Sequence, residues 1–149
     1  WVESCENETK QYVPEKYQLG IIADYLQEQN IEFGTEQRIF CYPIDIVGVR
    51  NGETYAIEMK SGDLSRGLEQ AHRDASFVDY SYLSVWDDRV SESLVEQAEN
   101  LPIGLMSVGE RVEILVEAEK STQQLCSREN VIKLINGDVR DDASVQKSQ

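Results

Sequence analysis

Residues 43–60 read PIDIVGVRNGETYAIEMK, and this stretch decides which fold the chain is expected to adopt. Its first half is β-branched and almost wholly apolar, which is typical of a strand buried on both faces. Asn51-Gly52 is a strong signal for a two-residue hairpin turn. The second half, Glu53 to Lys60, alternates between the two faces of a returning strand. The stretch therefore predicts two antiparallel strands inside a sheet.

Three charged side chains interrupt this apolar hairpin. Asp45 lies in the first strand, and Glu58 and Lys60 lie two residues apart on one face of the second. A charge inside a buried strand is costly unless it is paired or binds a metal ion. If the pairing continues outward from the turn, Asp45 lies opposite Glu58. We therefore expect the two carboxylates to converge on the same face of the sheet.

Converging carboxylates suit a hard divalent cation, which prefers oxygen ligands. Asp45 and Glu58, with the carbonyl of Met59 as a third ligand, form a candidate site for Mg²⁺, for which Mn²⁺ can substitute. Such an ion polarises a phosphoryl oxygen and lowers the pKa of a bound water, which Lys60 can orient or deprotonate. The alternative interpretation is structural: Asp45 is an exposed strand-end residue, and Glu58–Lys60 is a surface ion pair that contributes little.

The remaining segments show the periodicities of helices and strands separated by short breaks. In chain order they predict a helix over 15–29, an edge strand over 31–39, a helix from about 63 to 76, a strand over 80–86, a helix over 87–100, a hairpin over 103–117, and a last helix that begins at Ser127 and ends at Gly137. We expect a single α/β domain over 14–137, a frayed segment over 1–13 and a disordered polar tail over 138–149.

The motif Pro43-x-Asp45, followed across a hairpin by Glu58-x-Lys60, resembles the PD-(D/E)xK superfamily of restriction-endonuclease-like nucleases. The resemblance covers roughly residues 14–86. It implies a core in the order αβββαβ, with a mixed central sheet flanked by helices, to which this chain adds a helix, a hairpin and a helix. The implied activity is Mg²⁺-dependent hydrolysis of DNA or another nucleic acid by an endonuclease or exonuclease, in repair, recombination or defence.

The resemblance implies further site residues outside the hairpin. In this superfamily a glutamate in the first helix or strand often completes the metal site, and Glu15 and Glu36 are the two candidates here. Some members carry a catalytic glutamine in the helix after the Glu-x-Lys motif. Gln70 has that place in this chain.

The helix that contains Gln70 also supplies the densest basic group in the chain. With Lys60, this group consists of Arg66, His72 and Arg73. In the functional interpretation these side chains contact phosphates at the mouth of the site. In the structural interpretation they belong to a solvated helix face that is balanced by Glu69 and Asp74. The aromatic residues of the strand over 80–86 are interpreted as core rather than as a base-stacking surface.

The overall charge of the chain argues against a nucleic-acid partner. The formal net charge is −14, whereas domains that bind nucleic acid are usually basic. One explanation is an acidic surface adapted to a salt-rich, halophilic or archaeal cytoplasm, with a locally basic binding face. The other is that the chain does not bind nucleic acid. A non-cutting binding module of the same fold, an accessory domain of a larger protein and a homodimer therefore stay open.

The cysteines and the hydropathy indicate a cytoplasmic location. Three widely spaced cysteines and one histidine do not have the spacing of a zinc site. We expect reduced thiols, with a single disulfide or a catalytic pair of His72 with Cys41 or Cys126 as alternatives. No apolar run approaches the roughly 18 residues needed to span a bilayer, so no membrane partner is expected.

Overall fold

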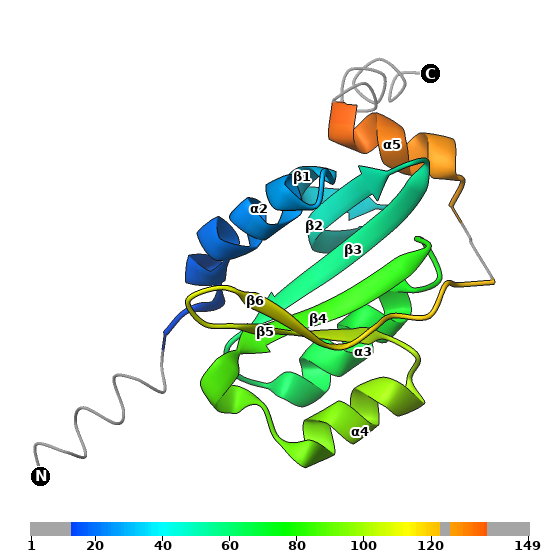
Figure 1. Cartoon of the computed structure of the whole chain (residues 1–149). Helices are drawn as coiled ribbons and strands as arrows, with labels where there is room; N and C mark the ends of the chain where they lie inside the picture. The colour runs from blue at the N-terminus through cyan, green and yellow to red at the C-terminus, as the bar shows by residue number, and fades with distance from the viewer. Residues whose placement is uncertain (1–12, 123–125, 137–149) are drawn as a thin grey trace, which may run out of the picture.

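A mixed six-stranded sheet forms the centre of the molecule, in the order β1-β2-β3-β4-β5-β6 (Figure 1). The computed structural model describes residues 13–122 and 126–136. The strands are β1 (Glu32–Ile39), β2 (Tyr42–Arg50), β3 (Glu53–Lys60), β4 (Tyr80–Trp86), β5 (Gly104–Val108) and β6 (Val112–Val116). The pairs β3–β4 and β4–β5 are parallel and the other neighbours are antiparallel, so β1 is an edge strand as predicted.

Helices cover both faces of this sheet, with α2 on one face and α3, α4 and α5 on the other (Figure 1). The helical elements are η1 (Glu15–Tyr17), α2 (Gln18–Glu28), α3 (Leu64–Asp74), η2 (Asp87–Arg89), α4 (Glu92–Asn100) and α5 (Arg128–Asn136). The chain is therefore an α/β protein with a flanked mixed sheet. None of the described helices is both long and apolar enough to cross a membrane.

The alternation along β3 determines which layer each of its side chains meets. Ile57 and Met59 belong to the apolar cluster that includes Ile22 and Leu26 of α2. Ala56 belongs to a different cluster, which includes a residue of α5. Glu58 and Lys60 follow Ala56 at two-residue spacing, so they face the layer of α3 and α5. The predicted division of this strand into two faces is confirmed.

The prediction of one continuous helix over 87–100 is wrong, because this segment forms two separate helices, η2 and α4. Val90 has an extended backbone, with φ −75° and ψ 135°, and separates the one-turn η2 from α4. The Oγ of Ser91 accepts a hydrogen bond from the N–H of Leu94 at 3.1 Å, so α4 has its own N-cap. Because a serine N-cap needs a non-helical backbone, the local cap outweighs the apolar periodicity that favoured one long helix.

Two other helix starts follow local signals. The predicted helix over 15–29 opens with the short η1 before α2 begins. The predicted N-cap at Ser127 is confirmed, since its Oγ accepts a hydrogen bond from the N–H of Asn130 at 3.2 Å. The expected end of the last helix at Gly137, the frayed segment up to residue 12 and the polar tail lie outside the described residues.

Helix α3 approaches the sheet closely at Gly67. A Cβ atom on Gly67 would lie 2.7 Å from the Cγ of Lys60 and 2.8 Å from the Cδ1 of Leu83. We therefore expect Gly67→Ala to lower the free energy of unfolding by about 1–3 kcal/mol, the usual cost of overpacking, despite the better helix propensity of alanine. Urea denaturation measures this change.

Gly20→Ala is the matched control for that substitution. Gly20 also lies in a helix, but nothing lies within 4 Å of the position of its Cβ. We expect Gly20→Ala to be neutral or stabilising, because only helix propensity changes. A Gly67→Ala variant as stable as the wild type would contradict the close packing of α3.

Candidate active site

The β2–β3 hairpin follows the predicted register from its turn outward, but the pairing stops one pair short of Asp45 and Glu58. Arg50 pairs with Glu53 next to the turn, and the described pairing ends with Ile46 and Ile57. Asp45 therefore reaches β3 through its side chain rather than as a ladder partner. Its Oδ2 accepts a hydrogen bond from the main-chain N–H of Met59 at 2.8 Å. A side chain thus satisfies a main-chain donor at the point where the pairing ends.

The alternation of β2 is interrupted at Asp45. Ile46 belongs to the cluster on the α2 face, whereas Ile44, two residues earlier, belongs to the cluster on the α5 face. On the neighbouring strand β1, Thr35 pairs with Ile46 and Gln37 pairs with Ile44. Glu36 lies between these two β1 residues and has a left-handed backbone, with φ 53°. Its side chain is exposed. The structure thus places Glu36 on an exposed edge strand and Asp45 at an irregular part of the sheet.

Glu58 and Asp74 are buried carboxyl groups joined by one arginine. Glu58 is 3% exposed and Asp74 is 0% exposed. The Nη2 atom of Arg73 lies 3.3 Å from the Oε2 of Glu58 and 2.8 Å from the Oδ1 of Asp74. The interpretation of Glu58 and Lys60 as a surface ion pair is therefore wrong.

The same surroundings shift the pKa values of both carboxyls. Burial raises the pKa of Glu58 to about 10, and the hydrogen bond and charge of Asp74 and the charge of Asp45 act in the same direction. Burial also raises the pKa of Asp74, against the hydrogen bond from Glu58 and the charge of Arg73. Burial and the repulsion between the carboxyls therefore favour a protonated form of this pair, against the charge of Arg73.

The pKa of Asp45 is subject to opposing effects from its surroundings. Burial raises its pKa, while the hydrogen bond from the N–H of Met59 and the positive charge of Lys60 lower it. The charge of Glu15 raises it further. The Oε1 of Glu15 accepts a hydrogen bond from the Oγ of Ser61 at 2.9 Å, which holds this glutamate beside the end of β3. Of the two glutamates expected to complete the site, the structure places Glu15 near Asp45 and Glu36 away from it.

Helix α3 adds oxygen atoms that have no hydrogen-bond partner. The Oε1 of Gln70 and the Oδ2 of Asp74 are buried, and within the described part of the chain neither finds a donor. Gln70 and Asp74 are one helical turn apart, so they lie on the same side of α3. Buried acceptors are nearly always satisfied in folded proteins. The proton that Glu58 shares with Asp74 can serve the Oδ2 of Asp74, and both oxygens are of the type that binds a hard cation.

The donor set fits Mg²⁺, which prefers carboxylate and carbonyl oxygens. In residues 13–122 and 126–136, however, no three His, Cys, Asp or Glu side chains are already arranged to hold a metal ion. Arg73 forms ion pairs with Glu58 and Asp74, and the N–H of Met59 donates a hydrogen bond to Asp45. A divalent cation would therefore bind only if these carboxylates exchanged their present partners for the metal.

The basic residues of α3 do not all face the site. Arg66 and Arg73 are seven residues apart and share one side of the helix, and Arg66 is exposed. Arg73 contacts the two carboxylates and donates a hydrogen bond to the carbonyl of Pro43. His72 lines a surface hollow together with Lys120, on a different side of α3. Arg73 is therefore the basic residue of α3 that the structure places at the carboxylates, and His72 lies apart from it.

Two residues that position the site were missed by the sequence reasoning. Asp74 was interpreted as part of a solvated face, which is wrong, since it is fully buried. Its helical spacing from the buried Gly67 and Ala71 was a usable signal. Gln18 is also fully buried; its Nε2 donates to the carbonyl of Lys60 at 2.9 Å, and its Oε1 accepts from Ser84. A buried glutamine at the start of a helix carries no comparable signal.

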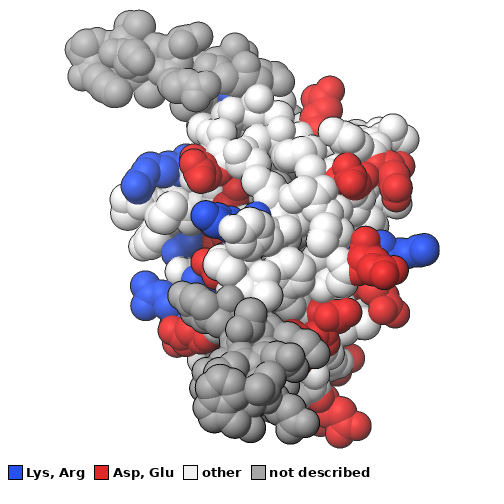
Figure 2. Space-filling view, turned by 90° about the vertical axis from the view of Figure 1, so that its left-hand side faces the viewer, with Lys and Arg blue, Asp and Glu red and all other residues white. Residues whose placement is uncertain are grey.

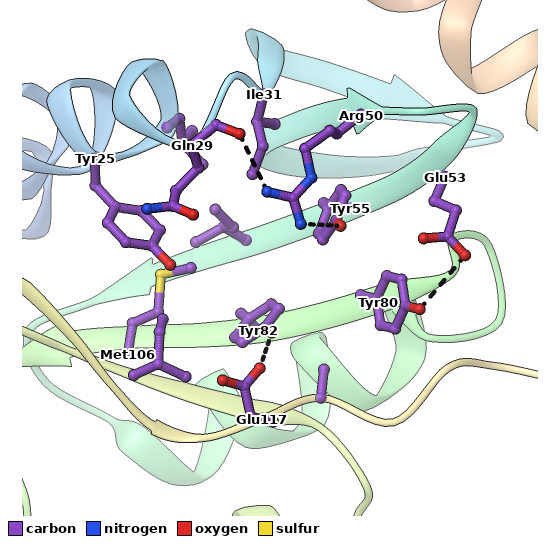
Figure 3. Close-up of a pocket in the computed structure, with 14 residues that line it drawn as sticks. Tyr25, Gln29, Ile31, Arg50, Glu53, Tyr55, Tyr80, Tyr82, Met106 and Glu117 are labelled. Atoms are coloured by element: carbon purple, nitrogen blue, oxygen red, sulfur yellow. Dashed lines mark hydrogen bonds between the residues drawn. The ribbon is translucent and has the colours of Figure 1, made fainter.

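A separate hollow of about 340 Å³ lies on the α2 face of the sheet (Figure 3). The tyrosines that line it are Tyr25, Tyr55, Tyr80 and Tyr82. Tyr82 belongs to the buried core, as predicted for this strand, and Tyr80 is half-buried. The hollow contains none of the predicted site residues. The carboxyl cluster on the opposite face is therefore the candidate active site.

The cysteines give no second candidate within the described residues. Cys41 and Cys126 are free thiols there. Burial raises the pKa of the Cys126 thiol, which disfavours the nucleophilic thiolate. Cys5 lies outside the described residues.

Comparisons of the chain with protein-family models, with curated proteins and with solved structures find no match. The function therefore has to be inferred from the chemistry of the carboxyl cluster. That cluster combines buried acidic groups, a nearby lysine and unsatisfied oxygen atoms.

Proposed function

We propose that this chain is a Mg²⁺-dependent nuclease that hydrolyses phosphodiester bonds of DNA. The observation that carries the proposal is the approach of Asp45, Glu58 and Lys60 at the end of the β2–β3 pairing. Helix α3 adds Asp74 to the same place, and the buried Oε1 of Gln70 lies one helical turn away on the same side of this helix. A restriction-endonuclease-like core is part of this proposal, and the order helix, three strands, helix, strand is compatible with it.

Each residue has a role that follows from its chemistry. Bound Mg²⁺ would polarise the scissile phosphate and lower the pKa of the attacking water. Asp45, Glu58 and Asp74, with the carbonyl of Met59, are the oxygen donors that would hold the ion. Glu58 would release its proton as the ion binds, because metal ligands must be ionised. Lys60 would orient the water and offset the charge that develops on the phosphate.

The proposal is tested with a panel of DNA substrates. Linear, nicked, flapped and four-way-junction DNA are incubated with the protein in Mg²⁺, Mn²⁺ or EDTA, at low and at high salt. The high-salt arm is needed because self-repulsion at a net charge of −14 weakens the folded state in dilute buffer. We expect cleavage of at least one substrate in Mg²⁺ or Mn²⁺ and none in EDTA. A folded protein that cuts none of them would contradict the proposal.

The acidic surface favours a second candidate, a non-cutting module of the same fold that binds a protein partner. Figure 2 shows acidic side chains mainly along one side of the viewed face, and basic side chains gathered mainly along the opposite side. The acidic side of this face and the net charge of −14 repel phosphates. The two candidates differ in their metal dependence. A chain that binds its target equally well in Mg²⁺ and in EDTA, without cutting DNA, would support the second candidate.

A further inference from the structure

Exposed aromatic side chains lie beside the candidate active site. Within the described residues, the large hydrophobic side chains that are exposed are Tyr17 (59%), Phe40 (64%) and Tyr42 (39%). All three are aromatic. Tyr17 belongs to the same one-turn helix as Glu15, which contacts the end of β3. Phe40 lies in the turn between β1 and β2, and Tyr42 is the first residue of β2.

Phe40, Tyr42 and the buried Phe77 form what we call the aromatic platform. The ring centroids of Phe40 and Phe77 are 5.5 Å apart with an edge-to-face arrangement, and those of Tyr42 and Phe77 are 5.7 Å apart and stacked. The guanidinium of Arg73 lies 4.7 Å from the centroid of the Tyr42 ring. The same guanidinium contacts Glu58. One side chain therefore connects the platform to the carboxyl cluster.

The conformation of Phe40 does not favour folding. Its backbone is left-handed, with φ 58°, which costs about 1–2 kcal/mol for an L-residue other than glycine. Its side chain is mostly in water, so burial recovers little of that cost. Glycine or asparagine suits such a turn position better. A bulky apolar side chain at this place is therefore better explained by a ligand that covers it.

The charge of the molecule indicates which contacts such a ligand can make. A net charge of −14 disfavours contacts with DNA phosphates, whereas the stacking of a base on an aromatic ring does not require a positive charge. Three cations of the described residues lie near the aromatic side chains, and one of them is Arg73 at the Tyr42 ring. Lys16 lies 5.5 Å from the centroid of the Tyr17 ring, and Arg38 donates a hydrogen bond to the carbonyl of Cys41 in the turn that carries Phe40. Stacking is thus the contact that this surface provides best.

We propose that the aromatic platform, together with Tyr17, stacks unpaired bases, so that the DNA bound at the carboxyl cluster has a single-stranded segment. Paired bases inside a duplex expose only their edges, so an aromatic ring cannot stack on them without opening the helix. As a statement about a nuclease substrate, this inference rests on the proposed function. Base stacking itself is measured without any cleavage.

The test measures binding in EDTA, where metal-dependent cleavage cannot occur. Fluorescence anisotropy compares labelled oligothymidine with a duplex and with an abasic strand, all of the same length. We expect oligothymidine to bind more tightly than either, because the abasic strand keeps the phosphates and lacks the bases. Phe40→Ala and Tyr42→Ala are each expected to weaken oligothymidine binding by about 5- to 150-fold, the range for removal of one base–aromatic stack.

Two further variants separate stacking from folding. Phe40→Asn is expected to weaken binding like Phe40→Ala while it raises the thermal midpoint, because asparagine tolerates the left-handed backbone. Tyr25→Ala removes an aromatic ring from the hollow on the opposite face of the sheet and is expected to leave oligothymidine binding unchanged. If the loss in Phe40→Ala came only from misfolding, Phe40→Asn would bind normally, which would overturn the platform.

Other outcomes also decide between the possibilities. Equal binding to the abasic strand or to the duplex, or unchanged binding in a double variant of Phe40 and Tyr42, overturns the platform. So does an absence of binding to any DNA, which would instead fit a protein partner. Stacking without cleavage in Mg²⁺ supports the platform and rejects the nuclease. Cleavage that does not depend on Phe40 or Tyr42 supports the nuclease and rejects the platform.

Discussion

Asp45→Asn and Lys60→Ala are each expected to reduce Mg²⁺-dependent DNA cleavage by about 10²- to 10⁴-fold, the usual contribution of a positioned catalytic group. Asparagine can still accept the hydrogen bond from the N–H of Met59, so Asp45→Asn removes the charge and keeps the contact that holds the strands. Lys60→Ala removes the lysine whose positive charge lowers the pKa of Asp45. Initial rates on the best substrate of the panel measure both effects.

The controls for these variants remove the same charges elsewhere. Asp88 is an exposed residue of η2, and Lys120 pairs with Glu53 at 2.8 Å at the other end of β3. Asp88→Asn and Lys120→Ala are expected to cut at the wild-type rate. The thermal midpoints of all four variants establish that they are folded. If Asp45→Asn and Lys60→Ala cut as fast as these controls, the assignment of the site is wrong.

Glu58→Gln is expected to make the metal-free protein more stable and to flatten the dependence of its stability on pH. The pKa of Glu58 is about 10 in the folded protein and 4.5 in the absence of such surroundings. Between these two values the folded protein holds a proton that the unfolded chain has released. The free energy of unfolding therefore falls as pH rises from about 5 to about 10, and this loss is complete above the folded pKa.

Glutamine removes this proton linkage without removing the contacts of Glu58. Its amide oxygen can accept from Arg73, and its amide nitrogen can donate to Asp74. Part of the pH dependence will persist, because the pKa values of Asp45 and Asp74 are also raised by burial. Urea denaturation in EDTA at pH 5, 7 and 9 measures the slope. An unchanged slope in Glu58→Gln would show that Glu58 is ionised at neutral pH.

Two comparisons complete that experiment. Glu69→Gln removes an exposed carboxylate from the same helix, α3, and is expected to keep the wild-type slope. Mg²⁺ is expected to stabilise the wild type more at pH 9 than at pH 5, because the metal binds the ionised carboxylates. Glu58→Gln is expected to lose most of that stabilisation. Equal stabilisation of both proteins by Mg²⁺ would place the metal elsewhere.

Much of the fold could be predicted because its signals are local. The Asn51-Gly52 turn gave the register of the hairpin from Arg50 and Glu53 to Ile46 and Ile57, since the side-chain period of a strand is two. The helix and strand periodicities placed most of the other elements. The exception was the segment over 87–100, where the N-cap at Ser91 competes with an equally local apolar pattern.

The site was predictable only in part. The motif placed Asp45, Glu58 and Lys60 on adjacent strands, and the structure brings them close enough for Lys60 to lower the pKa of Asp45 and for Asp45 to raise the pKa of Glu58. The motif gave no reason to expect that Arg73 would pair with Glu58, or that Asp74 would share its proton. Those contacts depend on how closely α3 packs on β3, which Gly67 permits.

By itself the sequence determined a buried hairpin that carries two carboxylates and a lysine, because turn chemistry and side-chain alternation act over a few residues. Only the tertiary structure decided that the pairing ends before Asp45, that Asp74 is buried rather than solvated, and that exposed aromatic rings lie beside the cluster. The physical reason is that burial, proton sharing and the grouping of side chains arise between elements far apart in the chain. No periodicity within one segment contains that information.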